Sequence, residues 1–309
     1  MIRRALLAAA GSDRLRDVAA GAPISRDVVR RFVAGEGTED AVEAARRLVG
    51  AGLLATIDHL GEDTTELAQA EATRTAYVTL LGRLADEGLT SGAEVSVKLS
   101  AIGQALPGDG EKIALEHARQ ICGAADAAGT TVTLDMEDHT TTDSTLGILT
   151  DLRRDFPSTG AVLQAYLTRT EGDCADLAYE GSRVRLCKGA YQEPATVAFQ
   201  ESAEVDRSYV RCMRVLMAGP GYPMVASHDP RLVEIAGALA VRYERPKGSY
   251  EYQMLYGVRP DEQARLAAQG EKMRVYVPYG DQWWGYLVRR MAEKPANLSL
   301  FLRALVSKS

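Results

Sequence analysis

Several charged or polar side chains in this chain interrupt or end short apolar segments, and these residues are the best placed to do chemistry. Lys98 follows one apolar run, Asp135 ends another, Arg185 stands in the middle of a third, and Tyr276 lies in the last one. A charge that is buried without a partner costs several kcal/mol. We therefore expect these side chains to meet groups of opposite charge or a ligand.

A second candidate for chemistry is a pair of adjacent arginines near the end of the chain. Arg289 and Arg290 would leave a helix about 100° apart, and Glu293 would be within reach of both. A guanidinium donates in a planar fork that matches the two oxygens of a carboxylate. The pair therefore predicts a grip on a small carboxylate, although a solvated helix face with the same residues is the alternative.

Eight short apolar segments could supply the elements that carry these residues. They are rich in β-branched and aromatic residues, which is typical of buried strands. They cover residues 53–58, 94–100, 131–135, 161–166, 183–187, 222–227, 249–254 and 273–277. Amphipathic stretches of helix length separate them, for example residues 111–128, 195–217 and 230–242.

The alternation of strand and helix predicts the fold class. Parallel neighbours need long crossover connections, so the pattern indicates parallel strands in an α/β fold. Eight units without a large gap favour a closed (β/α)8 barrel of the TIM type, and an open doubly wound sheet is the alternative. We expect an N-terminal helical arm over residues 1–50 and a catalytic barrel over residues 51–309. A last helix would lie over the carboxyl end of this barrel.

The polar residues cluster at the predicted strand ends, which would share one rim of the barrel. In this fold, chemistry takes place at the carboxyl ends of the strands. The residues at or near these ends are Asp58, His59, Lys98, Asp135, Glu137, Gln164, Tyr166, Arg185, Lys188, Tyr191, Ser227, His228 and Tyr276. So many polar groups at one rim predict an active site there.

Composition limits the partners and the location. The net charge of −6 and the lack of any run of Lys or Arg argue against nucleic acid as a partner. The four cysteines are widely spaced, which is typical of reduced thiols in a cytosolic protein. The apolar run at residues 5–10 is too short for a secretory signal, and no segment approaches a membrane span. We expect a soluble, cytoplasmic protein.

Two kinds of chemistry remain after the common motifs are considered. The four histidines do not pair at ligand spacing, so we expect no metal. The chain has no nucleophile elbow, no P-loop and no dinucleotide fingerprint after a strand. Lys98 or Lys188 could form a Schiff base, as in a lyase or aldolase. Alternatively, buried cations could stabilise the reduced ring of a flavin, and composition alone does not separate the two.

A set of motifs along the chain resembles the proline dehydrogenase family, in the order in which that family carries them. The motifs are VSVKLSAIG, TLDMED, LQAYLTR, RLCKGAY, ASHD, YEYQMLYG, YVPYG and YLVRRMAE, and they span about residue 50 to the C-terminus. The resemblance implies a flavoprotein that oxidises L-proline to Δ1-pyrroline-5-carboxylate, with hydride passing to N5 of FAD. The short chain, without an aldehyde dehydrogenase module, resembles the monofunctional bacterial form.

The resemblance also implies roles for individual residues. Those that match catalytic or substrate-binding positions are Lys98, Asp135, Tyr191, Leu255, Tyr276, Tyr286, Arg289 and Arg290. Among these, the two arginines match the pair that binds the proline carboxylate. Those that match positions near FAD are Gln164, Arg185, Lys188, Gly189, Ala190, His228 and Glu293. Arg185 matches the residue beside the flavin N5.

The resemblance further implies an electron acceptor outside the protein. In the family, electrons pass from the flavin to a membrane quinone. A cytoplasmic enzyme that reduces a membrane quinone is expected to make peripheral contact with the inner face of the cell membrane. The sequence does not indicate an oligomeric state.

Overall fold

The structure is a computed structural model that describes residues 29–287. Within this range the fold is built on eight strands that all run parallel to their hydrogen-bonded neighbours. The strands are β1 (Leu54–His59), β2 (Ala93–Val97), β3 (Val132–Leu134), β4 (Ala161–Gln164), β5 (Arg183–Cys187), β6 (Tyr222–Ala226), β7 (Glu251–Leu255) and β8 (Met273–Tyr279). Each predicted strand segment overlaps one of them, with ends that differ by a few residues.

The sheet closes into a barrel. Its order is β3-β2-β1-β8-β7-β6-β5-β4, so β1 pairs with β8 and the two ends of the sheet are β3 and β4. These ends meet where Thr133 forms a parallel bridge with Gly160, and the N–H of Leu134 donates to the carbonyl oxygen of Gly160 at 2.9 Å. The prediction of a (β/α)8 barrel is therefore confirmed, and the alternative of an open doubly wound sheet is wrong.

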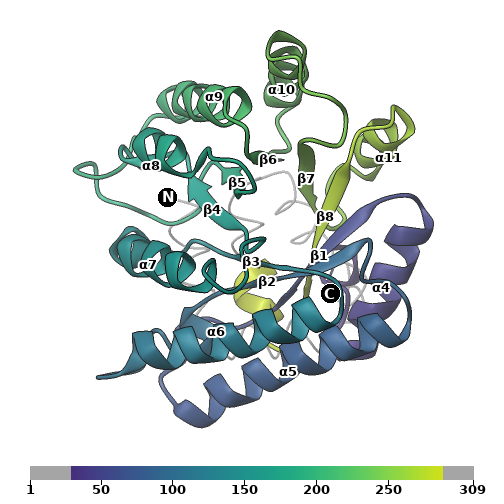
Figure 1. Cartoon of the computed structure of the whole chain (residues 1–309), viewed down its shortest axis with the longest axis vertical. Helices are drawn as coiled ribbons and strands as arrows, with labels where there is room; N and C mark the ends of the chain where they lie inside the picture. The colour runs from purple at the N-terminus through teal and green to yellow at the C-terminus, as the bar shows by residue number, and fades with distance from the viewer. Residues whose placement is uncertain (1–28, 288–309) are drawn as a thin grey trace, which may run out of the picture.

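Helices surround the strands (Figure 1). They are α4 (Thr38–Gly50), α5 (Leu67–Asp86), α6 (Gly110–Ala127), α7 (Thr142–Leu152), α8 (Thr170–Leu177), α9 (Ser202–Ala218), α10 (Pro230–Arg242) and α11 (Pro260–Ala268). Two short 3₁₀ helices, η1 (Ser100–Ile102) and η2 (His139–Thr141), follow β2 and β3. The apolar faces of these helices pack on the outer faces of the strands in one large core cluster.

One predicted helix begins later than expected. The sequence predicts a helix over residues 195–217, but α9 begins at Ser202. Residues 197–199 pair instead with the backbone after β4: Thr168 N–H donates to Val197 O at 2.9 Å, and Phe199 N–H donates to Tyr166 O at 2.8 Å. Backbone groups engaged in these bonds are not available to a helix.

The interior of the barrel is unusually polar. Alternate residues of a strand face the same side of a sheet, and the inward positions include Glu94 and Ser96 on β2, Arg185 on β5, and Glu251 and Gln253 on β7, all of which are buried. Parallel strands in this fold usually fill the interior with branched apolar residues. The polar groups here must therefore satisfy one another, and they form the floor of the site described below.

The two ends of the described chain meet. Helix α4 buries Ala41, Val42, Ala44 and Ala45 in the same core as the strands. A second apolar cluster joins Phe32 and Val33 to Leu60, Trp283 and Tyr286. No helix within residues 29–287 combines the length and apolar character needed to cross a lipid bilayer. Residues 283–287 are helical, and the rest of the predicted last helix lies outside the described residues.

Candidate active site

Arg185 and Asp135 form the centre of a buried polar cluster at the carboxyl ends of the strands. The guanidinium NH1 of Arg185 donates to Asp135 Oδ1 at 2.7 Å and to Ser96 Oγ at 2.8 Å, and Ser96 Oγ donates to the same carboxylate oxygen at 2.7 Å. Arg185 is 4% exposed and Asp135 is 8% exposed. Charge-assisted hydrogen bonds of this kind compensate for the cost of burying both charges.

Tyr276 on β8 completes this centre. Its hydroxyl donates to Asp135 Oδ2 at 2.7 Å, so both oxygens of Asp135 are engaged. The guanidinium carbon of Arg185 lies 5.4 Å from the centroid of the Tyr276 ring, within the range of a cation–π contact. Burial, followed by the charge of Asp135, raises the pKa of the Tyr276 hydroxyl well above its ordinary value. The hydroxyl therefore remains a neutral donor at physiological pH.

Lys98 contacts Tyr276 and the carboxylate of Asp58, for which the sequence predicted no role. Its Nζ is 2.7 Å from Asp58 Oδ2, 3.4 Å from Tyr276 Oη and 3.8 Å from Asp135 Oδ2. Burial alone would lower the pKa of Lys98, but the charges of Asp58 and then Asp135 outweigh it and raise the pKa. Lys98 is therefore a permanent ammonium group.

Glu137 adds an acid with unusual titration beside this cluster. One of its oxygens accepts from the backbone N–H of Ser100 at 3.1 Å, and the other accepts from Ser100 Oγ at 2.5 Å. Burial raises the pKa of Glu137 to about 7, and the hydrogen bonds from Ser100 and the charge of Lys98 offset this rise only in part. Glu137 therefore changes its protonation near neutral pH.

Two further predicted residues lie at neighbouring strand ends. Gln164 Nε2 donates to the backbone carbonyl of Glu137 at 2.6 Å, which links the ends of β3 and β4. The backbone N–H of Leu255 donates to His228 Nε2 at 2.9 Å. The other ring nitrogen, Nδ1, then carries the proton of the neutral imidazole and is a donor.

The loop after β5 depends on a glycine. Gly189 has φ = +109°, and a Cβ at this position would lie 2.2 Å from the ring of Tyr166. The absence of a side chain thus lets the loop pass over that ring. Tyr191 packs against the cluster of Tyr166, Leu167 and Ala198, and Ala190 is half-buried beside it.

Lys188 points away from the central cluster, toward the gap between α9 and α10. Its Nζ is 2.5 Å from Asp206 Oδ1 and 3.3 Å from Asp229 Oδ2. The hydrogen bond from Arg231, with further contributions from Lys188, lowers the pKa of Asp229 below its ordinary range. Asp229 is therefore charged, and the Nζ of Lys188 lies between its carboxylate and that of Asp206.

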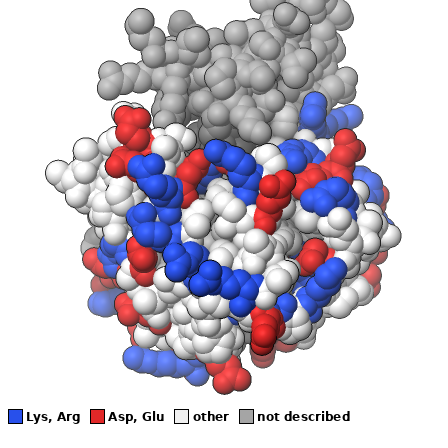
Figure 2. Space-filling model, turned by 90° about the horizontal axis from the view of Figure 1, so that it is seen from above, with Lys and Arg blue, Asp and Glu red and all other residues white. Residues whose placement is uncertain are grey.

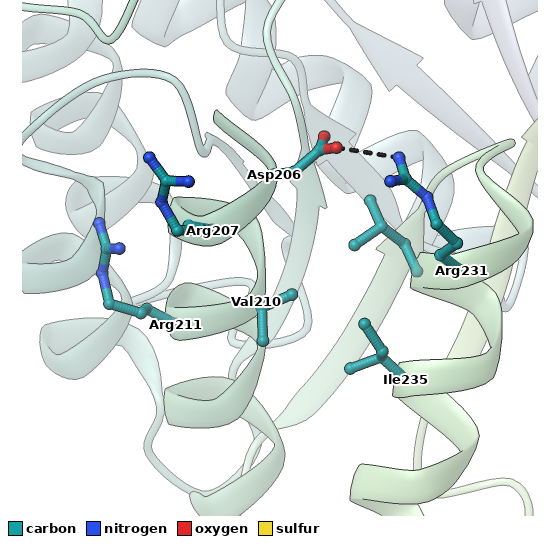
Figure 3. Close-up of a pocket in the computed structure, with 7 residues that line it drawn as sticks. Asp206, Arg207, Val210, Arg211, Arg231 and Ile235 are labelled. Carbon is teal, nitrogen blue, oxygen red and sulfur yellow. Dashed lines mark hydrogen bonds and ion pairs between the residues drawn. The ribbon is translucent and has the colours of Figure 1, made fainter. Parts of the chain in front are cut away.

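The same gap contains a pocket with a volume of about 390 Å³. Its apolar lining is Val210, Leu232 and Ile235, and its polar lining is Asp206, Arg207, Arg211 and Arg231. In Figure 3, Val210 and Ile235 face each other across the gap, and Asp206 reaches over to Arg231 at its mouth. The pocket therefore combines an apolar wall with three guanidinium groups and one carboxylate.

The outer surface carries both signs of charge. Lys and Arg side chains are interspersed with Asp and Glu over the face seen in Figure 2, and a band of basic side chains crosses it. The charges of this face are therefore mixed rather than of one sign.

The structure thus brings together Lys98, Asp135, Arg185 and Tyr276, and places Gln164, His228 and Leu255 at the same rim. Lys188 lies further out, and Tyr286 belongs to the apolar cluster that contacts the N-terminal segment. Three predicted residues, Arg289, Arg290 and Glu293, lie outside the described residues.

Sequence reasoning missed two residues of this site. They are Ser96 and Gln253, which form hydrogen bonds with Arg185. The signal that could have found them is polar residues at every second position of a strand, as in Glu94-x-Ser96 and Glu251-x-Gln253. That period places them on one face of a parallel strand, where apolar residues are the norm. Asp58 was placed at the rim without a role, and it is the nearest carboxylate to Lys98 among the described residues.

Fold and site together define a class: a (β/α)8 barrel with buried cations and carboxylates at the carboxyl ends of its strands, the place where such barrels carry out catalysis. Comparison with known proteins specifies the family. The sequence model of the family described as proline dehydrogenase matches residues 41–303. The chain belongs to the proline dehydrogenase family, which confirms the resemblance found in the sequence.

Relatives of similar length support this assignment. The chain is 38% identical over 279 residues to proline dehydrogenase 1 of Bacillus subtilis, covering 90% of this chain and 91% of that protein. It is 38% identical over 284 residues to proline dehydrogenase of Deinococcus radiodurans, covering 91% and 90%.

A solved structure supports the fold. It is proline utilization A from Bdellovibrio bacteriovorus, inactivated by N-propargylglycine, with a TM-score of 0.80 and 27% identity. The match covers 92% of this chain and 34% of that one, so this chain spans about a third of the larger protein.

Proposed function

We propose that this protein oxidises L-proline to Δ1-pyrroline-5-carboxylate with FAD as its cofactor, the first step in breaking proline down to glutamate. The observation that carries the proposal is the polar cluster of Lys98, Asp135, Arg185 and Tyr276 in a chain of the proline dehydrogenase family. This cluster offers a fixed ammonium group, a fixed guanidinium and a neutral hydroxyl at the rim where the barrel opens.

The substrate is a small zwitterion whose carboxylate needs a cation. Among the described residues, Lys98 can supply this cation, since the charges of Asp58 and Asp135 keep its amino group protonated. Arg289 and Arg290 would supply the planar forks that orient the carboxylate. Tyr276, Leu255, Tyr191 and Tyr286 would provide the walls around the pyrrolidine ring, which positions its ring carbon for oxidation.

The residues on the flavin side fit an anionic, partly apolar cofactor. When bound, FAD would accept the hydride from the ring carbon of proline and later deliver the electrons. Arg185 would provide a buried positive charge next to the ring system, and Gln164 and His228 would provide hydrogen-bond partners. Lys188 and Glu293, with the loop at Gly189 and Ala190, would contact the chain and phosphates of the cofactor. The pocket between α9 and α10 adjoins Lys188 through Asp206, which supports a cofactor long enough to reach it.

Electrons would leave to a membrane quinone, as the family implies. We propose a cytoplasmic enzyme that meets the inner face of the membrane peripherally during this transfer. The mixed charge of the face in Figure 2 is compatible with transient contact.

The Schiff-base alternative requires a neutral lysine amine as the nucleophile. The carboxylates around Lys98 raise its pKa, and Lys188 is paired with Asp206 and Asp229. Both lysines are therefore poorly suited to that chemistry, and we favour the flavin.

The proposal is tested by the visible spectrum of the purified protein. We expect flavin absorbance that bleaches on anaerobic addition of L-proline. Pyrrolidine is the matched control: it has the same ring without the carboxylate, and it should not bleach the flavin at equal concentration. A colourless protein that forms a covalent adduct with its substrate on borohydride treatment would refute the proposal.

A further inference from the structure

Gln253 is a buried amide that links the site to a deeper layer of charges in the barrel. It lies on β7 and is 3% exposed. Its Oε1 accepts from Arg185 Nε at 2.5 Å, and its Nε2 donates to Glu251 Oε1 at 2.5 Å. Because the oxygen faces a cation and the nitrogen faces an anion, the amide has one favourable orientation.

The layer below holds Glu251 firmly. Arg274 donates to both of its oxygens, from Nε at 2.7 Å and from NH2 at 3.1 Å, and the hydroxyl of Tyr222 donates to Oε2 at 3.0 Å. Arg274 NH1 also donates to the backbone carbonyl of Ala55 at 2.9 Å. Glu251 is therefore held rigidly, and its hydrogen bond from Gln253 Nε2 fixes the orientation of the Gln253 amide.

This support fixes the orientation of the plane of the Arg185 guanidinium. NH1 is held by Asp135 and Ser96, and Nε is held by Gln253. The contact of NH2 with Thr56 Oγ1, at 3.5 Å, is marginal. Without Gln253, the guanidinium would keep its hold on Asp135 but could turn about it. Gln253 is also neutral, so it orients the cation without cancelling its charge.

We infer that Gln253 is a positioning residue that aims the charge of Arg185 at the bound cofactor and so favours the electron-rich reduced flavin. The inference rests on the proposed function, because it assigns Arg185 to the flavin side. It concerns the energetics of the cofactor rather than the binding of proline, whose carboxylate is held by other residues.

The test is the flavin midpoint potential of Gln253→Met, a substitution that keeps the approximate shape and removes the amide. We expect the preference for reduced over oxidised flavin to fall about tenfold, which is a shift of about 30 mV to more negative potential for a two-electron couple. The kcat should fall by a similar factor, while KM for L-proline stays within about threefold. Gln253→Asn should behave in the same way, because its side chain is too short to reach both Arg185 and Glu251. This variant keeps a polar group in the barrel interior and serves as the test if Gln253→Met does not fold.

Tyr222→Phe is the matched control. It removes a hydrogen bond from the same Glu251 but does not touch Arg185. We expect a lower unfolding temperature and an unchanged potential. If the Gln253 variants and Tyr222→Phe lose stability alike and none shifts the potential, the inference is wrong while the proposed function stands. A wild-type protein that holds no flavin would overturn both.

Discussion

At the scale of single residues, Lys98 and Glu137 illustrate how the neighbours of a buried charge decide its chemistry. Lys98 is partly buried and Glu137 is buried, and they lie near the ends of adjacent strands. For Lys98, two carboxylates outweigh burial and the ammonium group is stabilised. For Glu137, the hydrogen bonds from Ser100 do not outweigh burial, and its pKa rises to about 7. The site therefore keeps one group permanently charged and leaves another to titrate near neutrality.

Glu137→Gln should change how stability depends on pH. The raised pKa means that folded Glu137 keeps its proton in a range where the unfolded chain has already lost it, so wild-type stability falls as pH rises from 4.5 to about 7. We expect the wild type to lose roughly 3 kcal/mol more than the variant over this range. Urea unfolding at several pH values measures both slopes. Parallel slopes would show that Glu137 titrates normally.

At the scale of elements, the loop from β5 to α9 contains most of the residues that we propose for the cofactor side of the site. It contains Lys188, Gly189, Ala190 and Tyr191, and it passes over the ring of Tyr166. Tyr166 in turn donates to Glu193 at 3.2 Å, and Glu193 accepts from the backbone N–H of His139 at 2.9 Å. The loops after β3, β4 and β5 are thus tied together, and a change in one of them should disturb the others.

Gly189→Ala should damage this loop. The substitution combines a left-handed backbone with a close approach to the Tyr166 ring, and we expect a loss of roughly 2–4 kcal/mol in the free energy of unfolding. Flavin retention should fall as well, because Lys188 adjoins the displaced residue. Denaturant unfolding and the flavin-to-protein absorbance ratio measure these effects.

The control for this prediction is Gly147→Ala in α7, where a Cβ would meet nothing within 4 Å. Alanine favours a helix by about 1 kcal/mol relative to glycine, so this variant should be as stable as the wild type or more so. Equal behaviour of the two variants would contradict the role given to Gly189.

At the scale of the whole molecule, the barrel is closed around charges rather than around apolar side chains. Below the site, Arg274 pairs with Glu251 at 2.7 Å, and Arg183 pairs with Glu94 at 2.5 Å. Arg274 outweighs burial and lowers the pKa of Glu251 to about 2. Removing one member of a buried pair leaves an uncompensated charge, which costs far more than the pair contributes in net terms.

Arg274→Met should therefore cost about 3–5 kcal/mol at pH 7. Adding Glu251→Gln should recover a large part of this loss, because the neutral amide can keep its contacts with Tyr222 and Gln253. The deficit of the single variant should shrink as pH falls toward 4, because the unpaired Glu251 becomes protonated. Below pH 4.5 it should shrink further, since the wild type then loses the stabilisation of a carboxyl pKa that is depressed from 4.5 to about 2. A double-mutant cycle from urea unfolding tests this, and purely additive losses would refute it.

The sequence by itself determined the eight parallel strands and the rim at which Lys98, Asp135, Arg185 and Tyr276 meet. Short apolar segments that alternate with helices allow few arrangements, and parallel strands bring their carboxyl ends to one edge. The start of α9 could not be predicted, because the pairing of residues 197–199 with the loop after β4 depends on contacts distant in sequence.

Only the tertiary structure decided which buried groups pair. Arg185 and Asp135 are 50 residues apart and come from strands that are not neighbours in the sheet, so their contact follows from the closure of the barrel. The same closure sets Gln253 on β7 against Arg185 on β5, whereas Asp58 meets Lys98 across the neighbouring strands β1 and β2. Strand periodicity predicts which side chains face inward, but which of them meet across the interior depends on how the strands close into a barrel.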